Sequence, residues 1–357
     1  MKNLPDFPPA PRGMKGRAAE LTTLARTIEV THPARLALVG AGGSGKSMLA
    51  CALGYRLAAR FGDRVHWCRV GAWDFRTLAE MLAVRFGTPR DRASLVPSLR
   101  RFLMQGGDRL IVLDNHEDDR VMARFLDELG GTPVTFVVTA RRCLLSGVLI
   151  FPVTAPLVTS GRHAFPRVAT LTRLLRWNPL ALDIADAIVA SERAATTESE
   201  LGRYLQTAGV DHIKTIAHED DLPEVALLVA WAWSRLGVRA RRMLGVLAHI
   251  DGDHMDLASL AELADVRTGI EDAITQLAEW HLVQEPMARR YALHAVVRYA
   301  VATRTTADRE RVFRHYVTLL EKHPERAAVE QTHLFAALDH AHRSGNVSAI
   351  LRVEALL

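Results

Sequence analysis

Residues 36 to 49, LALVGAGGSGKSML, join an apolar run to a glycine-rich turn that closes on Gly-Lys-Ser. Glycines allow backbone N–H groups to surround an anion, and the start of a following helix adds its dipole. The spacing from Gly40 to Ser47 fits G-x-x-x-x-G-K-[ST], in which the lysine reaches the β- and γ-phosphates and the serine hydroxyl ligates Mg²⁺. The predicted nucleotide contacts are Gly40, Gly42, Gly43, Ser44, Gly45, Lys46, Ser47 and the adjoining Met48.

The segments around this loop have the patterns that the motif requires. RLALVG before it is typical of a buried strand, and Lys46 to Phe61 predicts a helix with apolar residues on one face. A glycine-rich turn that binds nothing is the alternative, and the strand–loop–helix context argues against it.

A second buried strand supplies an acidic residue. In DRLIVLDNHEDD, Leu110 to Leu113 predict the strand core and Asp114 follows at its carboxyl end, where α/β sheets bind ligands. We expect Asp114 to hold Mg²⁺ together with Ser47. The next residue is Asn115, where many hydrolytic P-loop proteins have an acid, so Glu117 is the candidate general base.

A third strand, PVTFVVTARR, ends in Thr139 and Arg141. An arginine at the end of a strand that follows the Asp114 strand is placed to sense the γ-phosphate. The catalytic set predicted from the residues is therefore Lys46, Asp114, Glu117 and Arg141.

Composition limits the class of protein. The 357 residues are 49% hydrophobic and 24% charged, with a net charge of +5, which indicates a few packed domains and a basic surface. Three widely spaced cysteines match no metal site and suit a reducing cytoplasm. No apolar run reaches the length of a membrane span, so we expect no membrane partner. The proline-rich leader is expected to be extended and mobile.

Three further segments flank these motifs: MKGRAAELTTLARTI, LLRWNPLALDIADAIV and AITQLAEWHLVQEPMARRYALHAVVRYAV. In this order, and with the loop, they resemble the core of STAND-class P-loop ATPases. The branch resembled is NB-ARC, which includes plant resistance proteins, apoptosome scaffolds and many bacterial regulators. The resemblance covers about residues 14 to 300. It implies a switch that is closed with ADP and opens and associates with ATP, with slow hydrolysis.

The resemblance extends roles to further residues. Gly16 and Arg17 resemble the adenine-side entry segment of the family. Pro179 stands where the family has a proline near the adenine, and His294 stands where its Met-His-Asp histidine reaches the ADP phosphate. LIVLDN resembles the family's Walker B strand, and Thr139-Ala140-Arg141 resembles its sensor.

The sequence departs from the family at two places. Trp177-Asn178 replace the usual Gly-Leu before Pro179, which implies a reshaped adenine wall. Ala295 replaces the aspartate that helps to keep the ADP form closed, which implies a looser closed state.

The predicted fold class is an α/β P-loop NTPase with a parallel sheet, followed by helical modules. HLVQEP and RRYALH predict the strand pair of a winged helix, and HLFAALDHAHRSGN suggests the start of a helical repeat. The expected domains are a leader (1–13), a nucleotide-binding domain (14–155), a helical domain (156–222), a winged helix (223–303) and the repeat start (304–357).

Two other functions remain open at this point. One is a DNA-binding regulator that uses the winged helix, and the other is a P-loop hydrolase that turns over a substrate. GIEDAITQLAEWH, the expected recognition helix, carries Glu271, Asp272 and Glu279 but no lysine or arginine, so specific DNA binding is not expected. The partners predicted for the switch are ATP or ADP, Mg²⁺, an unidentified protein or signal ligand, and further copies of the chain.

Other clusters of metal-type ligands predict no metal site. His116 to Asp119 and DGDHMD at 251–256 are typical of helix starts and turns. His340 and His342 are two residues apart and would leave a helix on different sides.

Overall fold

The computed structural model describes residues 7–11, 16–71, 73–91, 93–154, 165–191, 197–208, 223–250, 252, 254–306 and 308–357. The chain divides into two compact units. Unit 1 comprises Met1–Gly40, Gly45–Thr154 and Leu334–Leu357, and unit 2 comprises Ala41–Ser44 and Ala155–His333. We describe each unit by itself.

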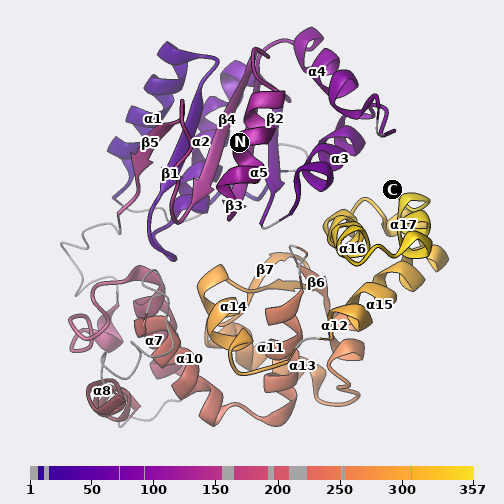
Figure 1. Cartoon of the computed structure of the whole chain (residues 1–357). Coiled ribbons are helices and arrows are strands. Elements are labelled where there is room, and N and C mark those ends of the chain that lie inside the picture. Colours follow the sequence, from indigo (N-terminus) through magenta and orange to yellow (C-terminus); the bar gives the residue numbers. More distant parts are fainter. Residues whose placement is uncertain are drawn as a thin grey trace. The chain divides into compact units, whose positions relative to one another are not determined.

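Five parallel strands form the centre of unit 1, in the order β2–β3–β4–β1–β5 (Figure 1). Because β4 lies between β3 and β1, the carboxyl ends of these three strands are neighbours. The elements of unit 1 are α1 (Ala18–Thr31), β1 (Arg35–Val39), α2 (Lys46–Phe61), β2 (Val65–Arg69), α3 (Phe75–Phe86), α4 (Leu95–Gln105), β3 (Arg109–His116), α5 (Asp119–Glu128), β4 (Val134–Ala140), β5 (Leu149–Pro152), α16 (Gln331–Ser344) and α17 (Val347–Glu354).

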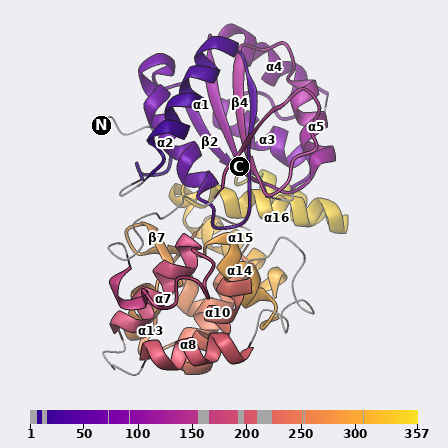
Figure 2. The ribbon, with the colours of Figure 1, turned by 90° about the vertical axis from the view of Figure 1, so that its left-hand side faces the viewer.

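Helices cover both faces of this sheet, with α1 and α2 on one face and α3 and α5 on the other (Figure 2). Side chains alternate accordingly. Leu36, Leu38 and Val137 pack with the buried residues of α1 and α2. Phe136, next to Val137, points the other way and its ring lies 6.1 Å from that of Phe125 on α5. Strands buried on both faces explain the continuous apolar runs in the sequence.

The helix after the glycine-rich turn begins and ends at the predicted residues, Lys46 and Phe61. Its buried residues include Leu49, Leu53 and Leu57, at the spacing of one helix face. The burial of this face against the sheet holds the start of α2 in place.

Part of the leader is packed on α2, and this differs from the extended, mobile leader that we expected. Phe7 is 9% exposed, and its ring meets those of Tyr55 and Trp67 edge-on at 5.6 and 5.3 Å. The Tyr55 hydroxyl donates a hydrogen bond of 2.9 Å to the carbonyl of Pro8. A Cβ atom at Gly54 would overlap the Phe7 ring, so Gly54 is what allows this close approach.

The last two helices of the chain, α16 and α17, belong to unit 1. The Asp339 carboxylate on α16 accepts hydrogen bonds from the Asp74 backbone N–H at 3.2 Å and from the Thr77 hydroxyl at 3.4 Å. Phe335 is fully buried, with its ring 6.2 Å from that of Trp73. These contacts join the end of the sequence to the start of α3.

Unit 2 consists of helices and a small antiparallel sheet in the order β6–β8–β7. Its elements are η1 (Pro166–Val168), α7 (Pro179–Ser191), α8 (Thr197–Ala208), α10 (Pro223–Arg235), α11 (Val238–His249), β6 (Met255–Asp256), α12 (Leu257–Leu263), α13 (Ile270–Glu279), β7 (Gln284–Met287), β8 (Arg290–Ala292), α14 (Ala295–Ala302), α15 (Arg309–Lys322) and η2 (Pro324–Arg326).

The second half of unit 2 has the predicted short helices, strand pair and final helix. Strand β6 was not predicted, because two residues are too short to show a period in a sequence. The Asp256 side chain caps α12 by accepting from Ala258 N and Ser259 N, as expected of DGDHMD, although residues 251 and 253 lie outside the described set.

Of the helical domain predicted over residues 156–222, the structure describes residues 165–191 and 197–208, and these are helical only in part. Residues 155–164 and 192–196 lie outside the described set, and residues 169–177 form turns after η1. A continuous helix ends here because Arg176 and Trp177 adopt positive φ angles of 49° and 56°. Pro179 begins α7, at the first helical position, where proline is tolerated.

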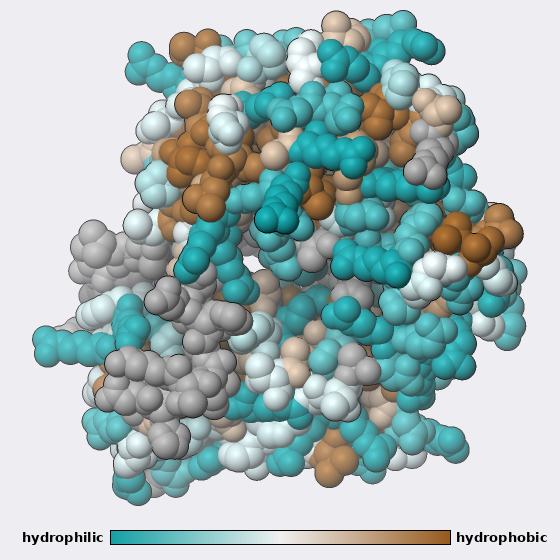
Figure 3. All heavy atoms as spheres, in the orientation of Figure 1, coloured by the Kyte–Doolittle hydropathy of each residue, from teal (hydrophilic) through white to brown (hydrophobic). Residues whose placement is uncertain are grey.

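Helix α17 exposes two apolar side chains one turn apart. Val347 is 66% exposed and Leu351 is 62% exposed, and brown side chains gather at this end of the molecule in Figure 3. That residues 304–357 begin a helical repeat stays a prediction. Within the described residues, none of the helices combines the length and apolarity of a membrane span.

We expect Gly54→Ala to destabilise the protein by about 1–3 kcal/mol, because the new methyl group displaces Phe7 from its buried position. In a Phe7→Ala background the same change should stabilise by up to about 1 kcal/mol, since alanine is the better helix former. Denaturant unfolding of the four proteins of this cycle measures both effects. If Gly54→Ala changed the free energy of unfolding in the same direction in the parent and in the Phe7→Ala background, Phe7 would not occupy this position.

Candidate functional site

The predicted phosphate loop lies at the carboxyl edge of the sheet. Val39, the last residue of β1, pairs in register with Ala140 of β4, and the Gly40 N–H bonds the Ala140 carbonyl at 3.3 Å. The loop ends at Gly45, whose φ of 88° is accessible to glycine at no cost and lets the chain turn directly into α2. The helix dipole of α2 therefore points at the loop.

Lys46 is the cation of this loop. Its Nζ donates a hydrogen bond of 2.7 Å to the carbonyl of Gly40, at the other end of the motif. Burial lowers the pKa of Lys46 to about 8, with a contribution from the positive charge of Arg141 that Asp114 partly offsets. A partly buried ammonium group at a helix N-terminus is suited to an anionic ligand, which would restore the lost stabilisation of its charge.

Asp114 is held by the neighbouring strand. Its side chain is buried, and its Oδ1 accepts a hydrogen bond of 2.6 Å from the hydroxyl of Thr139 on β4. The same Thr139 oxygen accepts the backbone N–H of Asn115 at 2.9 Å. One hydroxyl therefore fixes both the carboxylate and the backbone that carries it.

Asn115 has a role that the sequence did not reveal. The register of β3 against β4 shifts between Leu113 and His116, and Asn115 has a φ of 63°. Asparagine tolerates this left-handed conformation better than most residues, including glutamate. Its amide also donates to Oε1 of the exposed Glu117 at 2.8 Å, so the candidate base is held by a neutral neighbour.

The donors proposed for a metal ion fit Mg²⁺ in their chemistry. Ser47 is exposed at the start of α2, and Asp114 presents a carboxylate, so both offer the hard oxygen atoms that Mg²⁺ prefers. Met48 is 38% exposed beside Ser47, while Ser44 is buried within the loop.

Arg17 lies against the loop. It is 1% exposed, and its guanidinium group contacts both oxygens of Glu20, at 2.7 and 2.8 Å, and the carbonyl of Thr154, at 2.7 Å. Its NH2 atom would be 3.7 Å from a Cβ built at Gly45. These contacts therefore fix the side chain of Arg17, the residue after Gly16, next to the phosphate loop.

Arg141 is partly buried one residue beyond β4, and its charge acts on Lys46. The structure thus brings together Lys46, Asp114, Thr139 and Arg141 at one edge of one sheet. Their roles toward a nucleotide stay predictions.

Pro179 and His294 belong to unit 2, and their approach to a nucleotide also stays a prediction. Each begins or caps a helix: Pro179 opens α7, and His294 Nδ1 accepts the Val296 N–H of α14 at 3.3 Å. The helix after Pro179 is capped by the Asn178 side chain, which accepts from Ala181 N at 2.9 Å.

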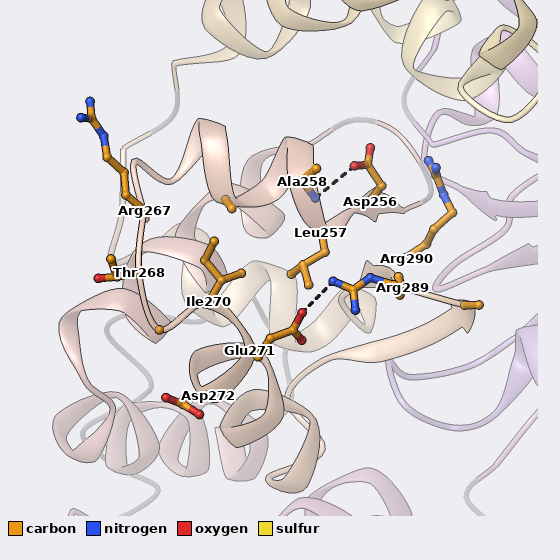
Figure 4. Close-up of a pocket in the computed structure, with 13 residues that line it drawn as sticks. Asp256, Leu257, Ala258, Arg267, Thr268, Ile270, Glu271, Asp272, Arg289 and Arg290 are labelled. Carbon is orange, nitrogen blue, oxygen red and sulfur yellow. Dashed lines mark hydrogen bonds and ion pairs between the residues drawn. The ribbon is translucent and has the colours of Figure 1, made fainter.

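A surface pocket of about 700 Å³ lies between α12, α13 and the β7–β8 turn of unit 2 (Figure 4). Its arginines have carboxylate partners. Arg289 pairs with Glu271 at 2.7 Å, Arg290 pairs with the buried Glu330 at 2.6 Å, and the exposed Arg267 lies 3.7 Å from Asp265. A nucleic acid at this face would have to compete with these acids.

Comparison with known proteins gives the fold. Neither a model of a protein family nor a curated protein matches the chain. Among solved structures, it is similar to the STAND protein PH0952 of Pyrococcus horikoshii, which has a tetratricopeptide repeat sensor. The TM-score is 0.59 at 17% identity, over 98% of this chain and 51% of that one. The chain therefore spans about half the length of PH0952.

Other similar structures include ORC1 of Aeropyrum pernix in complex with DNA and AMPPCP-bound DnaA of Aquifex aeolicus. Their TM-scores are 0.35 and 0.34, at 17% and 13% identity, over 84% and 74% of this chain and 95% and 88% of theirs. This chain shares the fold of PH0952, a parallel α/β sheet followed by helical modules.

The pKa of Lys46, about 8, predicts the pH dependence of nucleotide binding. Phosphate favours the ammonium form, so nucleotide affinity should be constant below pH 8 and fall by up to about tenfold per pH unit above it. Titration calorimetry in buffers of different ionisation enthalpy should detect proton uptake in that range. Lys46→Arg is the control, because arginine stays charged; an equal pH slope in both proteins would contradict the prediction.

Proposed function

We propose that this chain is an ATP- and ADP-binding switch of the STAND type. The observation that carries the proposal is the meeting of Lys46, Asp114 and Thr139 at the end of adjacent parallel strands, around a complete phosphate-loop motif. The fold shared with a STAND ATPase supports it. In the proposal, the ADP form is closed, and exchange for ATP opens the protein for association with a protein partner or with further copies in the cytoplasm.

Each residue of the proposed site has one task. Lys46 neutralises phosphate charge, and the glycine-rich backbone surrounds the phosphates. Ser47 and Asp114 would hold Mg²⁺, which supplies charge neutralisation between phosphate oxygens. Arg141 senses the γ-phosphate, and Arg17 orders the entry segment beside Gly45. Pro179 and His294 are the contacts that the family resemblance implies from unit 2, with Gly16 completing the entry segment.

Slow hydrolysis favours a switch over an enzyme with rapid turnover. The position after Asp114 is an asparagine in a left-handed conformation, so no carboxylate directly follows the proposed Mg²⁺ ligand. Glu117, the candidate base, is exposed and its Oε1 atom already accepts a hydrogen bond from the Asn115 amide. A DNA reader is less well supported, because the arginines of the unit 2 pocket are paired with acids.

The experiment that tests the proposal is identification of the nucleotide released when the purified protein is denatured. We expect stoichiometric ADP. The Lys46→Ala protein should retain at least about tenfold less nucleotide, because it lacks a charge-assisted contact to phosphate. Circular dichroism checks that the variant is folded. If a folded Lys46→Ala protein carries as much nucleotide as the parent, the loop does not bind it.

Steady-state ATP hydrolysis should be well below about 10 per second, the median enzyme turnover. We expect Glu117→Gln to lower the rate further, by about a hundredfold, and to leave ADP affinity unchanged, since a general base acts only in the chemical step. Glu29→Gln, a change of an exposed glutamate on α1, is the matched control. A fast parental rate that depends on Glu117 would identify a hydrolase instead of a switch.

A further inference from the structure

Three helices of unit 1 that are far apart in the sequence bring a histidine and two glutamates together. Glu80 lies in the middle of α3, His342 lies in the last turn of α16, and Glu354 ends α17. One carboxylate oxygen from each glutamate and one imidazole nitrogen lie within 4.8 Å of one another. This cluster belongs to neither the phosphate loop nor the unit 2 pocket.

Among the described residues, the two carboxylates share one cation, Arg76. The Glu80 side chain is only 4% exposed, and its Oε1 accepts a hydrogen bond of 2.5 Å from Arg76 Nε. Arg76 NH2 lies 3.6 Å from Glu354 Oε1. Two negative charges against one positive charge leave the cluster with an excess charge of −1 when His342 is neutral, and a buried carboxylate with incomplete compensation is costly.

His342 adds a second, independent observation. Its Nε2 atom is shielded from solvent and has no hydrogen-bond partner within the described part of the chain. Leaving such a nitrogen without a hydrogen-bond partner destabilises the folded protein. No hydrogen bond or ion pair among the described residues joins His342 to Glu80 or Glu354, although their ligand atoms face one small space.

We propose that Glu80, His342 and Glu354 form a binding site for a divalent transition-metal ion of the zinc type. One nitrogen and two carboxylate oxygens are a ligand set that Zn²⁺ accepts, with a further position for water. An ion bound through Nε2 satisfies this orphan nitrogen and the excess negative charge at once. Arg76 remains bonded to one oxygen of Glu80 and orients that carboxylate, as outer-shell partners of metal ligands do.

The surrounding contacts hold the ligands in place without an ion. Asp339, one turn before His342, accepts hydrogen bonds from Asp74 N and Thr77 at the start of α3. Phe335 is fully buried near Trp73. Because α16 is already docked on α3, the ion need not order the helices that supply its ligands. Its effect is to strengthen the attachment of α16 and α17 to α3.

The test is Zn²⁺ binding to the full chain after removal of metals with a chelator, followed by competition with a Zn²⁺ indicator. We expect a single saturable site that His342→Ala and Glu354→Gln each weaken at least about tenfold. His340→Ala is the matched control, since His340 is exposed on the same helix, and it should bind as the parent does. Lys46→Ala should also bind normally, which separates this site from the phosphate loop.

Hydrogen exchange gives a readout that does not depend on the indicator. Zn²⁺ should slow exchange in α16 and α17 of the parent and of His340→Ala, but not of His342→Ala. The proposal would be overturned if the parent bound no Zn²⁺ saturably, or if His340→Ala and His342→Ala lost Zn²⁺ affinity equally. The cluster would then be an ion-pair network centred on Arg76.

Discussion

The carboxylate of Asp114 and the ammonium group of Lys46 must both be held at a partly buried edge of the sheet, and the rest of unit 1 is arranged to meet this constraint. Parallel strands bring the ends of β1, β3 and β4 to one edge. The Thr139 hydroxyl bonds Asp114 and the backbone of Asn115 at once. Burial that lowers the pKa of Lys46 costs stability of its charged form. Apolar packing of α2 against the strands compensates for that cost.

Much of this arrangement was predictable, because its signals are local. The loop spacing, the limits of α2 and the acid at the end of β3 each depend on residues close together in the sequence. The roles of Asn115 and Arg17 were not predictable in detail. The left-handed φ of Asn115 depends on a register shift against another strand, and the burial of Arg17 depends on Thr154 and Gly45. The packing of Phe7 on Gly54 and the cluster of Glu80 with His342 depend on contacts between distant segments, which no periodicity reveals.

The number of basic residues does not by itself show how strongly the protein surface attracts a polyanion. A net charge of +5 indicates a basic surface. In unit 2, however, several arginines bind the protein's own acceptors. Arg290 binds the buried Glu330, Arg289 binds Glu271, and Arg241 donates to the carbonyl of Ser234. Buried or fixed guanidinium groups stabilise packing between elements, and they contribute less to a field that attracts a polyanion than their number implies.

The turn before Pro179 stores backbone strain at a place where the sequence departs from the pattern that it resembles. The resemblance expects glycine where this chain has Trp177, and Trp177 adopts a left-handed φ of 56°. That conformation costs a residue with a side chain about 1–2 kcal/mol, whereas glycine adopts it freely. Asn178, the second departure, supplies a cap to α7 through its bond to Ala181 N. The turn and the start of α7 therefore form at some cost in strain, and they present Trp177 and Asn178 directly before Pro179.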